Sequence, residues 1–194
     1  MVDIDALAAA LREAQQRGTP CAPLTERADA LTVEDAYAIQ QLNLERRGSP
    51  LIGHKIGLTS HAIQSWLGVD QPDFGGLLAD MQVLPGGVVS CEGLLQPRAE
   101  AEIAFVLAED LEGGPFGPAD IIAATDYLLP AIEIIDSRIA DWKISYRDTI
   151  ADNASSGLFV LGADPAPLTG AALELAGMAL RKNNRVVSTG AGAA

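Results

Sequence analysis

The chain has 194 residues, of which 48% are hydrophobic and 20% charged, so it can bury the core of one domain. Its formal net charge of −13 argues against a nucleic-acid partner, because binding to a phosphate backbone needs a basic surface. It contains no apolar run of about 18 residues, and its acidic start lacks the basic segment of a secretory signal, so we expect no membrane association and no secretion.

The first part of the chain, residues 1–48, is predicted to be helical. Apolar residues recur at helical spacing over residues 3–17, and Gly18 ends this pattern. A second helix is predicted at Val33–Arg47, where Thr32 is suited to cap the first turn. The segment between the two helices is predicted to be a loop. We therefore expect an N-terminal helical portion that precedes a different kind of domain.

The rest of the chain, residues 49–194, is predicted to be a β-rich domain with short helices. Strands are predicted at Leu51–Gly57, 88–91, 99–108, 129–136 and 157–161, with a hairpin at 178–181 and 185–188. Helices are predicted at 60–67 and 118–127, and a loop at 71–76. The fold class is therefore α+β, with a mixed, curved sheet that forms a roll or sandwich. The small residues at 188–194 resemble a cut loop, so we expect this domain to be truncated at its C-terminus.

Two cysteines, Cys21 and Cys91, are too few for a disulfide framework, and neither has the spacing of a metal ligand. This usage predicts a reducing compartment, the cytoplasm. The acidity of the chain has a consequence for any anionic substrate. Such a substrate would be repelled unless a metal ion or a well-placed lysine reversed the local field.

Two glutamates share one face of the strand predicted at 99–108. Alternate side chains of a strand point the same way, which places Glu100 and Glu102 about 7 Å apart, opposite an apolar face. Two negative charges this close are unfavourable unless water or a cation neutralises them. The pattern leaves two interpretations open, an ordinary solvent-facing strand and a metal site.

A third glutamate, Glu133, lies within the apolar segment Ile132-Glu133-Ile134-Ile135. A buried glutamate is rare unless it is paired or bound to a metal, and an ion pair with Arg138 is one alternative. Three carboxylates without a nearby His or Cys form a set of hard oxygen ligands, which suits Mg²⁺ or Mn²⁺ rather than Zn²⁺. Such a set leaves coordination positions open for a chelating substrate.

Five segments of the chain occur in the same order in a known family. They are Gly53-His54-Lys55-Ile56-Gly57-Leu58-Thr59-Ser60, Gln71-Pro72-Asp73-Phe74-Gly75, Glu100-x-Glu102, Ile132-Glu133-Ile134-Ile135-Asp136-Ser137-Arg138 and Asp152-Asn153-Ala154-Ser155-Ser156-Gly157. The chain from about Leu31 onwards thereby resembles the hydratase and decarboxylase family of catechol meta-cleavage pathways, within the fumarylacetoacetate-hydrolase-like superfamily. It is most similar to the 2-hydroxypenta-2,4-dienoate (2-oxopent-4-enoate) hydratases of that family.

The resemblance implies roles for particular residues. The metal ligands would be Glu100, Glu102 and Glu133, holding Mg²⁺ or Mn²⁺. The catalytic residues would be Lys55 and Asp73, and the substrate-binding residues would be Leu58, Ser155 and Ser156. Without the resemblance, Lys55 has the alternative of a surface lysine and Asp73 that of a turn former. We also expect a structural role for His54, an ion pair between Asp136 and Arg138, and packing roles for Trp142 and Tyr146.

The implied activity is the hydration of 2-hydroxypenta-2,4-dienoate to 4-hydroxy-2-oxopentanoate. The nearest alternative is the decarboxylation of 2-oxo-3-hexenedioate (4-oxalocrotonate), for which family members use the same metal ligands. An alternative of another class is a non-catalytic subunit that binds a partner enzyme of the pathway. We expect a homo-oligomer, because a small curved sheet leaves apolar surface that a second subunit can cover, and we also expect association with another pathway enzyme.

Overall fold

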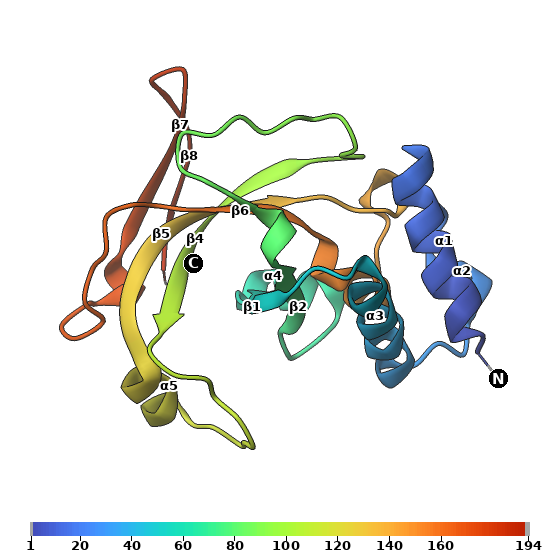
Figure 1. The fold of residues 1–194 in the computed structure, drawn as a ribbon, viewed down its shortest axis with the longest axis horizontal. Helices are drawn as coiled ribbons and strands as arrows, with labels where there is room; N and C mark the ends of the chain where they lie inside the picture. Colours follow the sequence, from blue (N-terminus) through green and yellow to red (C-terminus); the bar gives the residue numbers. More distant parts are fainter. Residues whose placement is uncertain (1, 193–194) are drawn as a thin grey trace. The chain divides into compact units, whose positions relative to one another are not determined.

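The computed structural model describes residues 2–192 of the chain, and Figure 1 shows the course of the backbone. The helices are α1 (Ile4–Arg17), α2 (Leu24–Arg27), α3 (Val33–Arg47), α4 (His61–Leu67), α5 (Pro118–Ala124) and α6 (Tyr146–Ala151). The strands are β1 (Leu51–Gly57), β2 (Asp73–Leu78), β3 (Gln82–Val83), β4 (Arg98–Leu107), β5 (Thr125–Ile135), β6 (Ser156–Leu161), β7 (Gly177–Lys182) and β8 (Arg185–Ala191). Four 3₁₀ turns among the described residues are η1 (Ala79–Met81), η2 (Ala140–Trp142), η3 (Asn153–Ser155) and η4 (Leu173–Leu175).

The strands form three sheets. A four-stranded sheet has the order β3-β6-β5-β4, while β1 pairs with β2 and β7 pairs with β8 in two antiparallel hairpins. Figure 1 shows β4 and β5 as long neighbouring strands. This mixture of helices and open sheets agrees with the predicted α+β class. No helix within residues 2–192 combines the length and the apolar character needed to cross a bilayer.

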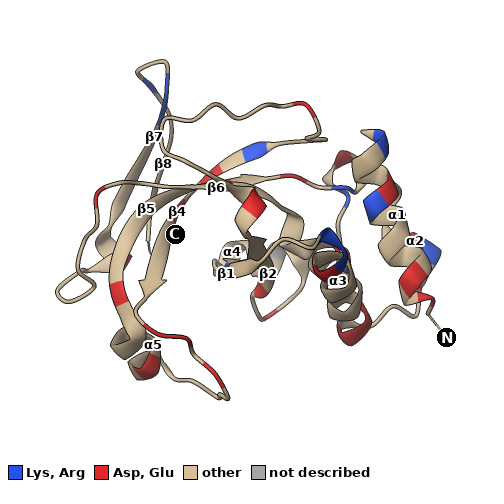
Figure 2. Cartoon of the chain, in the orientation of Figure 1, with Lys and Arg blue, Asp and Glu red and all other residues tan. Residues whose placement is uncertain are grey.

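The chain divides into two compact units, and β4, β5 and β6 each have residues in both. One unit comprises Met1–Val83, Gly87–Ala99 and Glu133–Phe159, and the other comprises Leu84–Gly86, Glu100–Ile132 and Val160–Ala194. Figure 2 shows acidic residues on helices and strands in both units, in keeping with the net charge of −13. The predicted boundary at residue 48 stays a prediction.

The two N-terminal helices form where the sequence predicts them, and their ends are capped. In α1 the Asp3 carboxylate accepts a hydrogen bond from the Ala6 N–H, and Gly18 ends the helix at a φ of 63°. In α3 the Thr32 hydroxyl and the Asp35 carboxylate form a reciprocal capping box. The loop predicted between these helices is wrong in part, because it contains the short helix α2.

The helices bury one shared core in the first unit. Its members come from α1, α2, α3, α6, the segment between α2 and α3 and the segment after β5: Leu7, Ala8, Leu11, Leu24, Leu31, Ala36, Ile39, Ile139, Ile150 and Ala151. Full burial of a leucine or isoleucine side chain contributes about 1.5–3 kcal/mol, so this cluster is a major source of stability for the unit. The cluster also packs α6 against α3. This contact positions the segment 152–157, one of the five that resemble the family, because that segment directly follows α6.

Two predicted elements in the middle of the chain are wrong. Residues 71–76 were expected to be a loop because of Pro72, Gly75 and Gly76, yet most of this stretch belongs to strand β2. The glycines serve close packing instead, since a Cβ on Gly75 would lie 2.4 Å from the Asn153 carbonyl oxygen. The strand expected at 88–91 is irregular, and Val88 is almost fully exposed.

The second unit contains most of β4 and β5 together with α5 and the β7–β8 hairpin. The hairpin forms as predicted, with Asn183 and Asn184 at positive φ in its turn. The predicted helix at 118–127 ends earlier, at Ala124, where β5 begins. On β4 the side chains expected to form an apolar face, Ile103, Phe105 and Leu107, are all exposed in part.

Candidate active site

The β1–β2 hairpin carries two of the predicted catalytic residues. Lys55 is opposite Gly75 and Asp73 is opposite Gly57, which brings both side chains to one end of the hairpin. A Cβ added to Gly57 would lie 2.2 Å from Oδ1 of Asp73 and 3.4 Å from Nζ of Lys55. The carboxylate and the amine therefore both border the small space that the glycine leaves open.

Lys55 is not a surface lysine. Its side chain is 11% exposed, and its Nζ donates a hydrogen bond of 3.0 Å to the carbonyl oxygen of Ala154. The same nitrogen lies 3.5 Å from Oε1 of Glu133. Glu133 is thus buried beside Lys55 rather than beside Arg138, the partner considered as an alternative.

The carbonyl that binds Lys55 belongs to a strained turn. Asn153, Ala154 and Ser155 have φ values of 57°, 50° and 53°, in the left-handed region that non-glycine residues rarely adopt. Conformations of this kind cost on the order of 1–3 kcal/mol each and persist only where surrounding contacts hold them. The turn thereby directs the Ala154 carbonyl toward Lys55 and leads directly into the two predicted substrate-binding serines.

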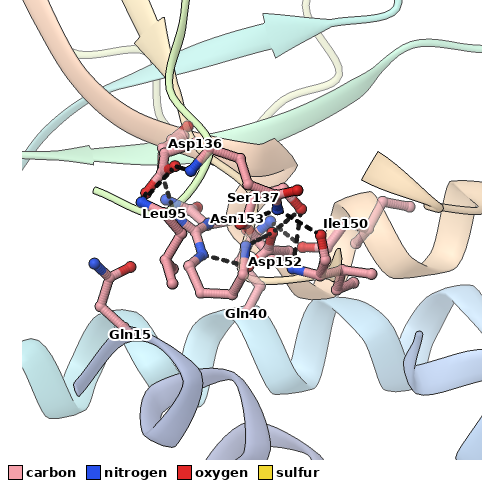
Figure 3. Close-up of polar contacts among 12 residues, drawn as sticks. Gln15, Gln40, Leu95, Asp136, Ser137, Ile150, Asp152 and Asn153 are labelled. Carbon is pink, nitrogen blue, oxygen red and sulfur yellow. Dashed lines mark hydrogen bonds and ion pairs between the residues drawn. The ribbon is translucent and has the colours of Figure 1, made fainter. Parts of the chain in front are cut away.

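The side chain of Asn153 holds this turn against β2. Its amide donates to the Gly76 carbonyl at 2.9 Å and its amide oxygen accepts from the Gly76 N–H at 2.7 Å. Gln40 of α3 supports the same region, since its amide donates to the carbonyls of Ile150 and Phe74 at 2.9 and 3.0 Å. Figure 3 shows Asn153, Gln40 and Ile150 in this polar network.

The ion pair expected between Asp136 and Arg138 is wrong. Asp136 accepts hydrogen bonds from the backbone N–H groups of Leu95 and Gln96, so it ties the segment before β4 to the end of β5 (Figure 3). Arg138 instead pairs with the buried Asp152, with Nε 2.5 Å from Oδ1. Burial raises the pKa of Asp152, and the positive charge of Arg138 acts in the opposite direction.

The predicted substrate-binding residues surround the same region. Ser155 and Ser156 are both buried, and within the described part of the chain neither hydroxyl has a hydrogen-bond partner. A buried hydroxyl without a partner is costly, so a ligand or a water that bonds to it would be favoured. Leu58 is partly buried with a φ of 58°, and its carbonyl accepts a 2.8 Å hydrogen bond from Gln64.

Asp73 is almost completely buried, with an exposed fraction of 2%. Desolvation raises its pKa above the ordinary value of 3.8, while the positive charge of Lys55 and a hydrogen bond from Thr149 lower it. That bond joins the Thr149 hydroxyl to Oδ2 over 3.3 Å. The carboxyl group therefore does not act as an ordinary turn former.

The three predicted metal ligands come together. Glu100 and Glu102 on β4 and Glu133 on β5 each offer a carboxylate oxygen, and these oxygens all lie within 4.8 Å of one another. Glu133 is buried, whereas Glu100 and Glu102 are exposed. A group made only of carboxylates provides the oxygen ligands that Mg²⁺ prefers. The donor set therefore fits a hard divalent cation.

The three other side chains with predicted roles have identifiable surroundings. His54 is exposed, with its ring edge-on to Phe74 at 6.0 Å. Arg98 stacks over Trp142 at 4.3 Å, and the Tyr146 hydroxyl donates to the Pro72 carbonyl at 3.0 Å. These contacts are consistent with the expected structural and packing roles.

Three residues near the site were missed in the sequence, namely Gly57, Thr149 and Asn153. A signal existed for Gly57, since a glycine within a strand often marks a close approach of another group. Asn153 lies in one of the five segments that carry the resemblance, although no role was assigned to it, and no pattern in the sequence distinguishes Thr149. Only the packing of α6 and η3 against β2 brings them to Lys55 and Asp73.

The chain is similar to known proteins in both sequence and fold. No family model matches the chain. A 2-keto-4-pentenoate hydratase of Paraburkholderia xenovorans is 48% identical over 190 residues, which span 96% of this chain and 71% of that protein. A 2-hydroxypent-2,4-dienoate hydratase of Pseudomonas putida is 48% identical over 196 residues, spanning 98% of this chain and 88% of that protein. The chain belongs to the 2-keto-4-pentenoate hydratase family.

The hydratase family fold also matches a solved structure. The 4-oxalocrotonate decarboxylase of Pseudomonas putida G7, complexed with magnesium and adipate, superposes with a TM-score of 0.90 at 38% identity, covering 98% of this chain and 73% of that one. The expected resemblance to the fumarylacetoacetate-hydrolase-like hydratases and decarboxylases is therefore confirmed. The roles of the individual residues are not tested by these likenesses and stay predictions.

Proposed function

We propose that this protein adds water to 2-hydroxypenta-2,4-dienoate to form 4-hydroxy-2-oxopentanoate, as a hydro-lyase of aromatic meta-cleavage catabolism. The observation that carries the proposal is the relationship to hydratases of this substrate, with identities of 48% over nearly the whole chain. The environment of Lys55 and Asp73, buried at one end of a hairpin, supports an enzyme rather than a non-catalytic subunit.

Mg²⁺ is the cation that we propose for the carboxylates of Glu100, Glu102 and Glu133, with Mn²⁺ as a substitute of similar ligand preference. A divalent cation bound there would stabilise negative charge on the C1 carboxylate and the C2 oxygen of the substrate. The related decarboxylase structure contains magnesium, which is consistent with this assignment.

The residues of the chain supply the remaining chemistry. Hydration moves a proton from the C2 hydroxyl to C5 and then adds water across C3 and C4, so it needs a group that accepts and returns protons. Asp73 suits this role because burial raises its pKa toward neutrality. The ammonium group of Lys55 provides positive charge beside the acidic cluster, which favours an anionic substrate despite the net charge of −13.

Substrate binding is assigned to Ser155, Ser156 and Leu58. The two buried hydroxyls can donate hydrogen bonds to an oxygen of the substrate and thereby gain the partners that they need. Leu58 would provide an apolar contact for the hydrocarbon part. Leu58 comes from the loop after β1, and the two serines come from the η3–β6 junction next to Ala154, whose carbonyl accepts a hydrogen bond from the Lys55 amine.

Decarboxylation of 2-oxo-3-hexenedioate is the second candidate activity. The match to 4-oxalocrotonate decarboxylase, with a TM-score of 0.90, favours keeping it. The two reactions differ in their products, because the decarboxylase releases CO₂ whereas the hydratase consumes water. Both would need a cation and a proton-transferring group, so the geometry of the site does not separate them.

The test is incubation of the protein with freshly prepared 2-hydroxypenta-2,4-dienoate and Mg²⁺ or Mn²⁺, with the product identified by NMR. Formation of 4-hydroxy-2-oxopentanoate supports the proposal. Release of CO₂ from 2-oxo-3-hexenedioate without turnover of the dienoate would support the decarboxylase, and turnover of neither would support the non-catalytic subunit.

A second experiment tests the cation site. Titration of Mn²⁺ followed by electron paramagnetic resonance should show weaker binding in Glu102→Gln than in the unmodified protein. Glu26→Gln, on the exposed side of α2, is the control and should bind the ion normally. Equal affinities in all three proteins would remove Glu102 from the ligand set.

We also infer that copies of the chain assemble into a homo-oligomer. Exposed apolar side chains on β4, among them Phe105 and Leu107, offer surface that a second subunit could cover. Sedimentation velocity should give a mass of at least two chains, and a mass of one chain would contradict the assembly. Association with another enzyme of the pathway stays a prediction.

A further inference from the structure

Thr149 makes a contact with Asp73 that goes beyond the predicted roles. It lies on α6 and is buried, with an exposed fraction of 5%, and its hydroxyl is 3.3 Å from Oδ2 of Asp73. The two residues are 76 positions apart, so the contact depends on the packing of α6 against β2.

The helix that carries Thr149 is fixed on both sides of it. The preceding residue, Asp148, accepts hydrogen bonds from the N–H and the hydroxyl of Thr25 at 3.1 and 2.8 Å. The carbonyl of the following residue, Ile150, accepts from the Gln40 amide at 2.9 Å. The backbone on both sides of Thr149 is therefore anchored, which places its hydroxyl beside Asp73.

The other carboxylate oxygen of Asp73 points in a different direction. Oδ1 lies 2.2 Å from the place that a Cβ of Gly57 would occupy, and Nζ of Lys55 lies 3.4 Å from that same place. A hydroxyl carries one proton, and in donating it to Oδ2 Thr149 uses one lone pair of that oxygen, which disfavours a proton on Oδ2 relative to Oδ1. A proton carried by the carboxyl group then resides on Oδ1, on the side of Lys55.

We infer that Thr149 is a positioning residue, which binds Oδ2 of Asp73 so that proton exchange with the substrate takes place at Oδ1. The inference rests on the proposed function, because it specifies which atom of Asp73 performs the proton transfer. It is supported by the electrostatics of the carboxyl group, since a hydrogen bond from Thr149 stabilises the charged form and lowers the pKa against the effect of burial.

The other ionisable groups that face Asp73 come from three elements. Lys55 on β1 lowers the pKa of Asp73, whereas burial, with a smaller contribution from the charge of Asp73, raises the pKa of Tyr37 on α3 and of Tyr146 on α6. Substitution of Thr149 leaves all three in place. A change in the titration of Asp73 in such a variant therefore reports the loss of the hydroxyl.

The test compares Thr149→Val with Thr149→Ser. Valine keeps the volume but has no hydroxyl, so kcat at pH 7 should fall about tenfold while KM changes little, as expected for the loss of one hydrogen bond to a charged group. The limb of the pH–rate profile that disappears in Asp73→Asn should also move to higher pH in Thr149→Val. Serine keeps the hydroxyl and should restore both properties.

Thr25→Val is the matched control, because it removes a partly buried threonine hydroxyl from Asp148 without touching Asp73. It should lower stability and leave the pH profile unchanged. A pH profile of Thr149→Val that coincides with that of Thr25→Val would overturn the inference, and so would a Thr149→Ser variant as impaired as Thr149→Val.

The failure of the proposed function would be seen separately. If the unmodified protein does not turn over the dienoate, the carboxyl carbon of Asp73 can still be titrated by ¹³C NMR in the unmodified protein and in Thr149→Val. A higher pKa in the variant supports the link between the two residues whatever the substrate, and an unchanged pKa overturns it.

Discussion

The amine of Lys55 lies 3.5 Å from a carboxylate oxygen of Glu133, and both side chains are almost completely buried. Glu133 is at the same time one of the three carboxylates that could hold a cation. The buried lysine and a bound cation would therefore share one negative charge. This arrangement connects the stability of the protein with the occupancy of the proposed metal site.

The substitution Lys55→Met should destabilise the metal-free protein. Removing one partner of a buried ion pair typically costs about 3–5 kcal/mol, because the remaining buried charge loses a compensating charge. Added Mg²⁺ should recover part of the loss, since a cation at Glu133 would neutralise that charge and binding to the folded state stabilises it. Urea denaturation with and without Mg²⁺ measures both effects.

The control for this prediction is Lys143→Met. Lys143 pairs with Asp141 at 3.5 Å, but both side chains are more than two-thirds exposed, so the change should have almost no effect on stability. If Lys55→Met and Lys143→Met had the same free energy of unfolding without metal, the Lys55–Glu133 pair would not stabilise the folded protein.

Asp73 should make the stability of the protein depend on pH. Its pKa is raised in the folded state, so the folded protein binds more protons than the unfolded chain over the interval between the two pKa values. The free energy of unfolding should therefore fall as the pH rises through this interval above 3.8, and stay lowered at higher pH. Asp73→Asn should lack this contribution and lose activity as well.

Urea denaturation at a series of pH values would test this prediction. The quantity to compare is the difference in the free energy of unfolding between the unmodified protein and Asp73→Asn. Other groups, including Asp152 with its raised pKa, contribute equally to both and cancel in the difference. Asp110→Asn, at an exposed position, is the control and should follow the unmodified protein. If the free energy of unfolding depended on pH in the same way in Asp73→Asn and in the unmodified protein, the raised pKa would not belong to Asp73.

Gly57→Ala should impair the site more than it impairs the fold. The new Cβ would lie 2.2 Å from Oδ1 of Asp73, so the carboxyl group must move away from its place beside Lys55. We expect kcat/KM to fall by about 100-fold or more, the scale of a lost general acid–base contribution. Gly53→Ala on the same strand is the control, because its Cβ would meet nothing within 4 Å and activity should be retained.

Asn153→Ala should lower both stability and activity. The variant loses two hydrogen bonds to Gly76 and places an alanine at a φ of 57°, a combined cost of about 2–4 kcal/mol. Asn183→Ala is the matched control, since Asn183 also has a positive φ but lies in the exposed turn of the β7–β8 hairpin. It should cost about 1 kcal/mol and leave turnover unchanged.

The two costs can be separated with Asn153→Gly, which tolerates the left-handed backbone but has no amide. Thermal denaturation should place it between the unmodified protein and Asn153→Ala. A glycine variant with full stability and turnover would show that the amide bonds to β2 are not needed to hold the turn.

The local structure of the chain was largely predictable where it depends on neighbouring residues. The ends of α1 and α3 follow from capping residues within one helical turn, namely Thr32, Gly18 and Gly48. The β7–β8 hairpin follows from two asparagines in its turn. These features were confirmed because each depends on hydrogen bonds between residues only a few positions apart.

Errors arose where distant segments determine the local conformation. Gly75 and Gly76 belong to a strand because Asn153 and Leu44 approach them closely, not because the chain turns there. Asp136 accepts hydrogen bonds from the backbone of Leu95 and Gln96, about 40 positions away, instead of pairing with Arg138. The residues around Asp136 in the sequence do not indicate this choice of partner.

The sequence alone determined the family and the chemical type of the site, because the acidic and basic residues that define it stand in recognisable order along the chain. Only the tertiary structure decided that Lys55 faces Glu133, that Asp73 is buried against Thr149, and that Asn153 holds the Ala154 carbonyl in place. Burial and partner choice depend on how β2, α6 and η3 pack together. Desolvation and charge at those contacts, rather than residue type, shift the pKa of the Asp73 carboxyl group, which is the property that the proposed proton transfer needs.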